Sequence, residues 1–290
     1  MLSRPGLVFR GKVLPETSLV MAIVNRTPDS FFDKGRTFSL QAALDRVDQV
    51  VAEGAHIVDI GGVRAAPGEE VSAAEEADRV LPVVEAVRAK HPTMVLSVDT
   101  FRASVAEQVL AAGADLVNDA WECPEPDTFD VAASFGAGVV CTHAGHLPPR
   151  TRPHRIAYPD VVADVVGTLS GLAARAVAAG VPRESVLIDP GHDFGKNTRH
   201  SLLLTRHTSA LVETGWPVLM ALSRKDFVGE VLDLLPDDRL EGTLAATAVC
   251  AFQGARVFRA HDVAATVRAL QMVDAIRGIA PPVVNVRGLA

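Results

Sequence analysis

Eight short apolar runs alternate with longer helical stretches, and this alternation is the sequence feature that most constrains the fold. The runs, rich in β-branched residues, cover residues 18–24, 56–60, 94–99, 115–119, 137–142, 185–189, 217–222 and 255–258. Stretches with helical periodicity lie between them, among them 41–54, 73–90, 103–113 and 161–180. Strands covered by helices on the outside read as continuous apolar runs, and eight strand–helix units are the count of a (β/α)8 barrel. The sequence therefore predicts an α/β protein with the TIM-barrel fold.

The chain reads as a single domain over residues 1–290, with the barrel proper at about residues 19–277. Its 290 residues exceed the usual domain length, but α/β barrels commonly reach this size, and a hydrophobic content of 48% supplies the core. We find no linker, low-complexity tract or internal repeat. A doubly wound open sheet is the alternative, and the absence of G-x-G-x-x-G after the first strand disfavours it.

Composition excludes several classes of function. A formal net charge of −7 argues against nucleic acid as the main partner, since binding the phosphate backbone needs a broad basic face. Cys123, Cys141 and Cys250 are odd in number and widely spaced, which predicts neither disulfides nor a zinc site and fits a reducing cytoplasm. Without an apolar leader or a run of 18 apolar residues, we expect a cytoplasmic protein with no membrane segment.

Polar side chains end nearly all of the predicted strands. In a barrel, catalytic groups lie at the carboxyl ends of the strands and in the loops that follow them. A single Asp at such a position can be a helix N-cap, but polar groups at all eight ends predict one shared site. These residues are Asn25, Asp59, Asp99, Asn118, Asp119, His143, Asp189, Ser223, Arg224, Lys225, Arg259 and His261.

Basic residues follow two of these strands. Arg224 and Lys225 stand where a helix begins, and a helix N-terminus already favours anions. Arg259 and His261 follow the last strand. Two cationic strand ends predict a ligand that carries phosphate or pyrophosphate, and the alternative is ordinary solvated surface charge. With Asn25, Arg259 and His261 could hold pyrophosphate and its Mg²⁺, which takes few protein ligands.

Asp99, Asn118 and Asp189 suit a planar, nitrogen-rich heterocycle. A carboxylate accepts two hydrogen bonds from an amino-pyrimidine edge, and an amide both donates and accepts. If these groups are buried without partners, a ligand or a cation must satisfy them. Phe194 could pack against the ring, and Lys225 could donate to a ring acceptor or to phosphate.

Several segments together resemble the block motifs of dihydropteroate synthase. They include MAIVNRTPDSFFDKG at 21–35, VLIDPGHDFGKN at 186–197 and LMALSRKDFVG at 219–229, and the resemblance covers about residues 19–277. It implies a TIM barrel, usually a homodimer, that joins 6-hydroxymethyl-dihydropterin pyrophosphate to p-aminobenzoate and releases pyrophosphate. The reaction implied is displacement at the pterin methylene, eased by electrostatic stabilisation of the leaving group.

The resemblance also implies roles for individual residues. Lys225, Arg259 and His261 would be catalytic, and Asn25, Arg259 and His261 would bind pyrophosphate, with Asn25 at the Mg²⁺. The implied pterin pocket consists of Asp99, Asn118, Asp189, Phe194 and Lys225.

Departures from the family pattern cluster on the side of the second substrate. Arg26 replaces the usual Val of the first loop, and the second loop has Arg64, Ala65 and Ala66 where the family reads GG-x-STRPG. Asp226 replaces the Ser at the helix N-terminus that would receive the p-aminobenzoate carboxylate. We expect Asp226 to satisfy that N-terminus itself and to repel the incoming carboxylate, at a cost on the order of 1–4 kcal/mol.

One more change, Asp193 where the family has Gly in DPG-x-G-FGK, adds negative charge near the pterin end of the implied site. The combination resembles a divergent second dihydropteroate synthase paralogue of mycobacteria and related actinomycetes, which has little or no synthase activity. We therefore expect binding of the pterin pyrophosphate with weak or altered condensation with p-aminobenzoate or another amine. The alternative is a non-enzymatic pterin-binding protein or a partner of an active synthase. A methyltransferase acting on methyltetrahydrofolate would not need Lys225, Arg259 and His261.

Overall fold

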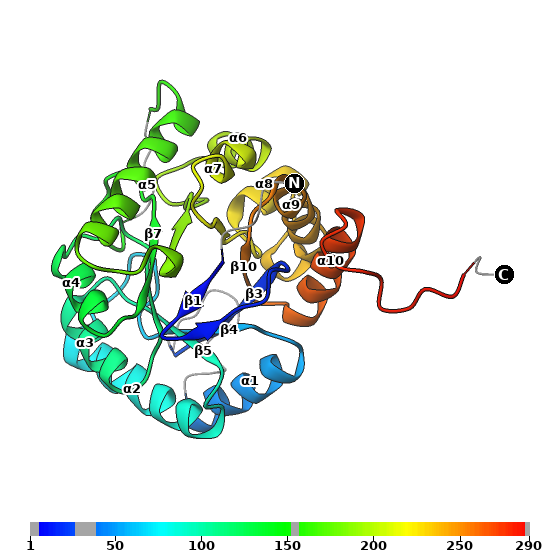
Figure 1. Ribbon diagram of the computed structural model, residues 1–290. Coiled ribbons are helices and arrows are strands. Elements are labelled where there is room, and N and C mark those ends of the chain that lie inside the picture. Colours follow the sequence, from blue (N-terminus) through cyan, green and yellow to red (C-terminus); the bar gives the residue numbers. More distant parts are fainter. Residues whose placement is uncertain (1–5, 27–38, 152–156, 288–290) are drawn as a thin grey trace.

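The computed structural model describes residues 6–26, 39–151 and 157–287. Eight parallel strands form one sheet in the order β8-β7-β6-β5-β4-β3-β10-β9. The strands are β3 (Leu19–Asn25), β4 (Ile57–Gly61), β5 (Val95–Asp99), β6 (Leu116–Asp119), β7 (Gly138–Thr142), β8 (Val186–Asp189), β9 (Leu219–Met220) and β10 (Val257–Ala260). A parallel bridge between Ile188 and Val218 joins the two ends of the sheet. The prediction of a TIM barrel is confirmed (Figure 1).

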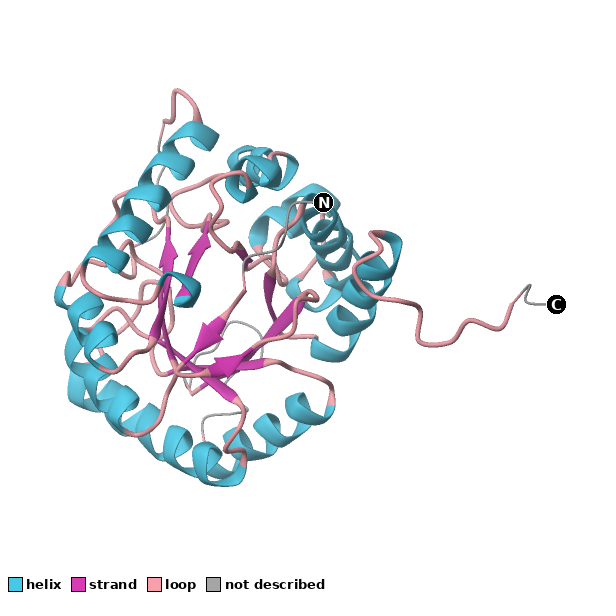
Figure 2. Cartoon of the chain, in the orientation of Figure 1, coloured by secondary structure: helices cyan, strands magenta, loops and turns pink. Residues whose placement is uncertain are grey.

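Helices surround the sheet, and at least one follows every strand of the barrel (Figure 2). They are α1 (Leu40–Ala52), α2 (Ala73–Lys90), α3 (Ala103–Ala111), α4 (Asp127–Ser134), α5 (Val161–Ala178), α6 (Thr198–Arg206), α7 (Thr208–Val212), α8 (Asp226–Leu232), α9 (Leu240–Gln253) and α10 (Val263–Ile276). Caps fix where several of them begin. The Ser72 hydroxyl accepts the Glu75 N–H at 3.1 Å, and the Asp160 carboxylate accepts two N–H groups at the start of α5.

Helix α5 has the length and apolar composition of a membrane span. The core helix of a soluble protein has the same properties, and α5 buries Val165, Leu169, Ala173 and Ala176 in the main hydrophobic cluster. These residues recur every three or four positions and therefore form one face of the helix. The burial of this face identifies α5 as part of the layer that covers the barrel.

A short antiparallel hairpin, β1 (Val8–Phe9) and β2 (Lys12–Val13), precedes the barrel and was not predicted from the sequence. It closes the end of the barrel opposite the site, because Leu7 and Phe9 are fully buried among apolar side chains from all eight barrel strands. At Gly138 an added Cβ would lie 2.6 Å from the Phe9 ring. A 2.5 Å ion pair between Lys12 and Asp115 fastens the hairpin to the barrel.

Phe9→Ala is expected to lower the free energy of unfolding by about 3–5 kcal/mol, because it leaves a cavity inside a closed barrel. Urea denaturation followed by circular dichroism measures the change. Val13→Ala is the matched control, since this hairpin side chain is 76% exposed and should change stability by less than about 0.5 kcal/mol. Equal losses of unfolding free energy in the two variants would contradict the role of Phe9 in filling the closed end of the barrel.

Candidate functional site

Four side chains from four strands form an ionic cluster at the mouth of the barrel. Arg259 of β10 donates from Nε to Asp59 Oδ2 at 2.6 Å and from Nη2 to Asp99 Oδ2 at 3.0 Å. Asn118 of β6 donates from Nδ2 to the same Asp59 oxygen at 3.1 Å. The structure thus brings Asp99, Asn118 and Arg259 together, as the sequence predicted. Asp59 is fully buried beneath them.

Arg259 offsets part of the negative charge of the two carboxylates in this cluster. Burial raises the pKa of Asp99 to about 7, against the attraction of Arg259. The carboxylates of Asp59 and Asp99 raise the pKa of Arg259, although burial opposes its charge. We expected Asp99 and Asn118 to need a ligand or a cation if they were buried without partners. Both have partners within the protein, since Arg259 donates to Asp99 and Asn118 donates to Asp59.

Asp189, Phe194 and Lys225 form a second part of the mouth. Asp189 ends β8, is buried, and accepts the Gly191 N–H through Oδ1 at 2.7 Å. The Lys225 ammonium lies 4.8 Å from the centroid of the Phe194 ring and donates to the carbonyl oxygen of His192. Burial raises the pKa of Asp189 and lowers that of Lys225, and the two charges partly offset these shifts.

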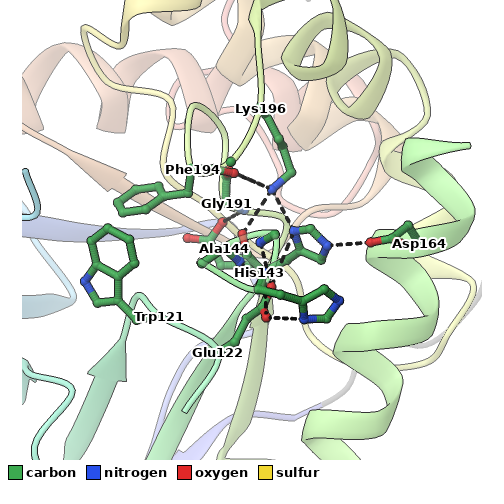
Figure 3. Close-up of polar contacts among 12 residues, drawn as sticks. Trp121, Glu122, His143, Ala144, Asp164, Gly191, Phe194 and Lys196 are labelled. Carbon is green, nitrogen blue, oxygen red and sulfur yellow. Dashed lines mark hydrogen bonds and ion pairs between the residues drawn. The ribbon is translucent and has the colours of Figure 1, made fainter. Parts of the chain in front are cut away.

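Trp121 completes an aromatic wall that the sequence analysis missed. Its ring meets Phe194 edge to face, with centroids 5.0 Å apart and an interplanar angle of 78° (Figure 3). Ala120 and Ala144 are buried beside it, and Phe101 packs against the same group. The only signal in the sequence was an aromatic residue two positions after the polar end of the fourth predicted strand. The wall offers a flat apolar surface next to polar groups.

Asn25 and His261 lie on the other side of the mouth. Both line a cavity of about 630 Å³ between α1 and the N-terminus of α10, whose wall also includes Arg46. His261 Nδ1 is 3.0 Å from the Ser223 hydroxyl, and Arg46 donates to the His261 carbonyl oxygen at 2.6 Å. None of the residues predicted to bind pterin lines this cavity. It therefore extends from the predicted pyrophosphate side, away from the heterocycle.

Arg224 does not belong to the anion site that its position next to Lys225 suggested. Its guanidinium donates to both carboxylate oxygens of Asp262, at 2.7 and 2.9 Å, and to the carbonyl oxygens of Pro236 and Asp237. Arg224 has a left-handed backbone, with φ of 57°, and is buried. The expectation of a basic pair facing one ligand is thus wrong, and Arg224 instead ties the loop after β9 to the start of α10.

Asp193 and Asp226, both departures from the family pattern, meet at the first turn of α8. The Asp226 N–H donates to Asp193 Oδ2 at 2.7 Å. The Asp226 carboxylate points away, is 70% exposed, and accepts from Arg239 Nη1 at 3.0 Å. We expected Asp226 to satisfy the helix N-terminus by itself. The structure corrects this, because the carboxylate of Asp193 caps the helix.

The other divergent residues lie in the first two loops. The Arg26 N–H donates to the Gly61 carbonyl oxygen at 2.7 Å, and burial lowers the pKa of its guanidinium. Arg64, Ala65 and Ala66 follow β4 in a largely exposed loop, which Arg150 joins through the Ala66 carbonyl oxygen at 3.2 Å. Residues 27–38, which include the whole TPDSF motif, lie outside the described part of the chain.

His143 is fully buried and belongs to a polar network beside the mouth (Figure 3). Its Nε2 lies 2.8 Å from Asp164 Oδ1, and its Nδ1 lies 2.8 Å from the Lys196 ammonium. These contacts engage both ring nitrogens and support a structural role for His143. Glu122 and Lys196, the other charged members of the network, were not singled out.

Asp119 is a buried carboxyl group whose titration should affect stability. Its Oδ1 accepts the Trp121 N–H at 2.7 Å, and burial raises its pKa to about 7. Between about pH 4 and pH 7 the folded state therefore holds a proton that the unfolded state releases, so stability falls as pH rises through this window. The cost, on the order of 4 kcal/mol at most, is fully present above pH 7.

Asp119→Asn is therefore expected to flatten the fall in unfolding free energy between pH 5 and pH 8. Urea denaturation of both proteins at the two pH values measures it. The comparison with the unaltered protein is necessary because Asp99, also with a pKa of about 7, contributes a slope of the same sign. A slope unchanged in Asp119→Asn would show that the carboxyl group does not titrate in this window.

Comparison with known proteins connects this geometry to a family. A family model described as pterin binding enzyme matches residues 21–261. The "Inactive dihydropteroate synthase 2" of Mycobacterium tuberculosis is 57% identical over 282 residues, which cover 96% of this chain and 89% of that protein. The dihydropteroate synthase of Bacillus subtilis is 40% identical over 263 residues, covering 90% of this chain and 89% of the relative.

A solved structure shows the same architecture. It is that of Xanthomonas albilineans dihydropteroate synthase with 4-aminobenzoic acid, which superimposes with a TM-score of 0.85 at 39% sequence identity. The match covers 96% of this chain and 100% of the other. At this identity and coverage the similarity extends over the whole barrel.

Proposed function

The chain belongs to the family of pterin-binding enzymes that includes dihydropteroate synthase, and we propose that it binds 6-hydroxymethyl-7,8-dihydropterin pyrophosphate at the barrel mouth. We propose further that it condenses this ligand with p-aminobenzoate weakly or not at all. One observation carries the proposal. The residues for the heterocycle stand together at the mouth, whereas the first turn of α8, on the side of the second substrate, is capped by Asp193.

The heterocycle would lie against the aromatic wall of Trp121 and Phe194. Asp189 would accept hydrogen bonds from the amino-pyrimidine edge through the carboxylate oxygen that does not hold Gly191. Asn118 can both donate and accept, and Lys225 would donate to a ring acceptor. An apolar wall with a few convergent polar groups is typical of small-molecule sites.

Pyrophosphate would lie toward Asn25 and His261, next to Arg259. Arg259 would bind the pyrophosphate oxygens in place of some of its contacts with Asp59 and Asp99. Its guanidinium would stay positively charged throughout. Mg²⁺ fits this side, because the Asn25 side chain supplies an oxygen and pyrophosphate supplies further ones. Its chemistry there would be to neutralise charge on the leaving group.

Condensation should be weak because two carboxylates stand at the start of α8. A p-aminobenzoate carboxylate brought to this turn would meet Asp193, which already accepts the Asp226 N–H, and the exposed carboxylate of Asp226. Arg239 offsets the charge of Asp226 only in part, since it forms one contact with that carboxylate. Each repulsion at about 4 Å costs on the order of 1–4 kcal/mol.

The alternative is a pterin-binding protein without catalysis, a sensor or a partner of an active synthase. It would have the same wall, Asp189 and Lys225, but no amine would release pyrophosphate. The capping of α8 by Asp193 favours this alternative over a synthase of altered amine specificity, because the contact is internal and leaves that turn satisfied without a substrate.

We also propose a homodimer in the cytoplasm. Helices α9 and α10 expose a set of apolar side chains, Val249, Phe252, Met272 and Ile276, that a second copy would cover. The three cysteines are free, which fits a reducing compartment. Sedimentation velocity tests the dimer, and Phe252→Asp should give the monomer.

Isothermal titration of the protein with the pterin pyrophosphate and Mg²⁺ tests the proposed function directly. We expect saturable binding with a dissociation constant in the micromolar range or below. Titration with inorganic pyrophosphate and Mg²⁺ alone is the control, and it should give much weaker binding because it lacks the heterocycle. An absence of pterin pyrophosphate binding would refute the proposal.

A further inference from the structure

Glu122 joins the loops that follow β6 and β7. Its carboxylate accepts the backbone N–H groups of Ala144 and Gly145, each at 2.7 Å, and that of His146 at 3.0 Å. It also lies 2.8 Å from the His146 ring. A carboxylate that accepts several backbone N–H groups fixes the path of the chain, since each of these groups would otherwise need another partner.

Lys196 joins the loops that follow β7 and β8, and it is only 5% exposed. Its Nζ lies 2.9 Å from the Phe194 carbonyl oxygen, 3.0 Å from that of His143 and 3.1 Å from that of Gly191. The fourth acceptor is His143 Nδ1 at 2.8 Å (Figure 3). An ammonium group has three protons, so all of them are used within the protein.

His143 presents the correct tautomer to this ammonium. Its Nε2 faces the Asp164 carboxylate at 2.8 Å, and a carboxylate only accepts, so Nε2 carries the proton. Nδ1 is then an acceptor for Lys196. Burial and the neighbouring charge of Lys196 both lower the pKa of His143, which keeps the ring neutral.

The Lys196 contacts hold together two chain segments that cross closely at His143 and Gly191. Gly191 has φ of 64°, and an added Cβ would lie 2.0 Å from the His143 carbonyl oxygen. Three residues later Phe194 packs its ring on Trp121, which directly precedes Glu122. The aromatic wall is therefore attached at one end through Glu122 and at the other through Lys196.

We propose that Lys196 is a positioning residue for the pterin site, where it holds the Gly191 and Phe194 carbonyls against the end of β7 so that the Phe194 ring stands at a fixed place in the wall. The proposal rests on the proposed function, since only a bound heterocycle makes that ring a ligand contact. Burial lowers the pKa of Lys196 to about 7, so the position carries an electrostatic cost that packing alone would not require.

A double-mutant cycle between Lys196→Met and Phe194→Ala tests it. Each single variant should weaken binding of the pterin pyrophosphate about tenfold, and Lys196→Met should weaken it by less than twofold further in the Phe194→Ala background. Independent, multiplicative effects would show that Lys196 does not act through the Phe194 ring, which would overturn the proposal. Lys12→Met, which removes the lysine paired with Asp115 at the opposite end of the barrel, is the control and should leave affinity unchanged.

Two readouts do not depend on ligand. In a Trp216→Phe background the fluorescence reports Trp121 alone, and Lys196→Met should shift its emission maximum. Amide exchange over residues 191–196 should accelerate at least tenfold. Unchanged emission and exchange would contradict the positioning role of Lys196, whether or not the protein binds pterin. If both changes occur but the protein does not bind pterin, only the proposed function is refuted.

Asp164→Ala provides a second variant if Lys196→Met does not fold, because the Asp164 side chain is 36% exposed. It removes the carboxylate that holds the proton on His143 Nε2, so the ring can carry its proton on Nδ1, where it opposes the Lys196 ammonium. We expect the same direction of change in Trp121 emission and loop exchange, with pterin affinity reduced about threefold. A variant that matches the unaltered protein in all three measurements would overturn the proposal.

Discussion

Replacing both Asp193 by Gly and Asp226 by Ser should raise the affinity for p-aminobenzoate at least tenfold in the presence of bound pterin. The physical reason is the removal of two carboxylates from the first turn of α8, where one of them now accepts the backbone N–H at 2.7 Å. Each repulsion is worth on the order of 1–4 kcal/mol, and vacating the N–H restores a donor for the incoming carboxylate. Titration calorimetry with p-aminobenzoate measures the gain.

The single variants distinguish the two carboxylates. Asp226→Ser removes an exposed charge that Arg239 partly offsets, so its gain should be smaller than that of Asp193→Gly. Asp233→Gly is the matched control, because it removes the same charge at the other end of α8, where φ of 55° suits glycine. It should change affinity by less than twofold. An affinity unchanged in the double variant would contradict the repulsion argument.

Asp189→Asn should weaken binding of the pterin pyrophosphate roughly a hundredfold without unfolding the protein. The amide oxygen can keep the Gly191 N–H, whereas its NH₂ group replaces the carboxylate oxygen expected to accept from the pterin amino edge. A lost hydrogen bond to a charged group costs about 1.5–3 kcal/mol, and two opposed donors add repulsion. Burial raises the pKa of Asp189, so removing its charge should not lower stability.

Asp119→Asn is the control for this substitution. Asp119 ends the strand β6, is buried, and accepts one backbone N–H at 2.7 Å, just as Asp189 does. It has no predicted contact with the ligand. The affinity of the Asp119→Asn protein for the pterin should therefore stay within threefold of the unaltered value. Equal losses in Asp119→Asn and Asp189→Asn would show that any buried charge at a strand end matters, and would remove the specific role of Asp189.

The barrel was predictable because its strands are buried on both faces. Continuous apolar runs such as 56–60 and 137–142 have few alternative structures when helical stretches separate them, and both lie in strands. The hairpin at Val8–Val13 was not predictable in the same way. Its two strands contain two residues each, and their stability depends on Phe9 entering a barrel that forms from distant sequence.

The different contacts of neighbouring residues in the site were harder to predict from the sequence. Arg224 and Lys225 are adjacent and both basic, yet a left-handed backbone at Arg224 turns it toward Asp262 and leaves Lys225 beside Phe194. Sequence periodicity gives no indication of such a local backbone state. The pairing of Arg259 with Asp59 joins residues 200 positions apart and also requires the closed barrel.

The departures at Asp193 and Asp226 could be recognised in the sequence, but the contact between them could not. Each was identifiable as an added negative charge, and each was assigned to a different part of the site. Only the fold shows that they meet, with one capping the helix and the other paired to Arg239. Lys196 was quoted within a motif but given no role, because its four acceptors come from two loops that only the barrel brings together.

Pyrophosphate release from 6-hydroxymethyl-7,8-dihydropterin pyrophosphate with Mg²⁺, measured with and without p-aminobenzoate, tests the central claim most directly. The account predicts that the protein binds the pterin pyrophosphate but that p-aminobenzoate increases release little or not at all. The Asp193→Gly, Asp226→Ser double variant should increase that response. Rapid release by the unaltered protein that depends on p-aminobenzoate would contradict the account, because the capped helix α8 would then be no obstacle to the second substrate.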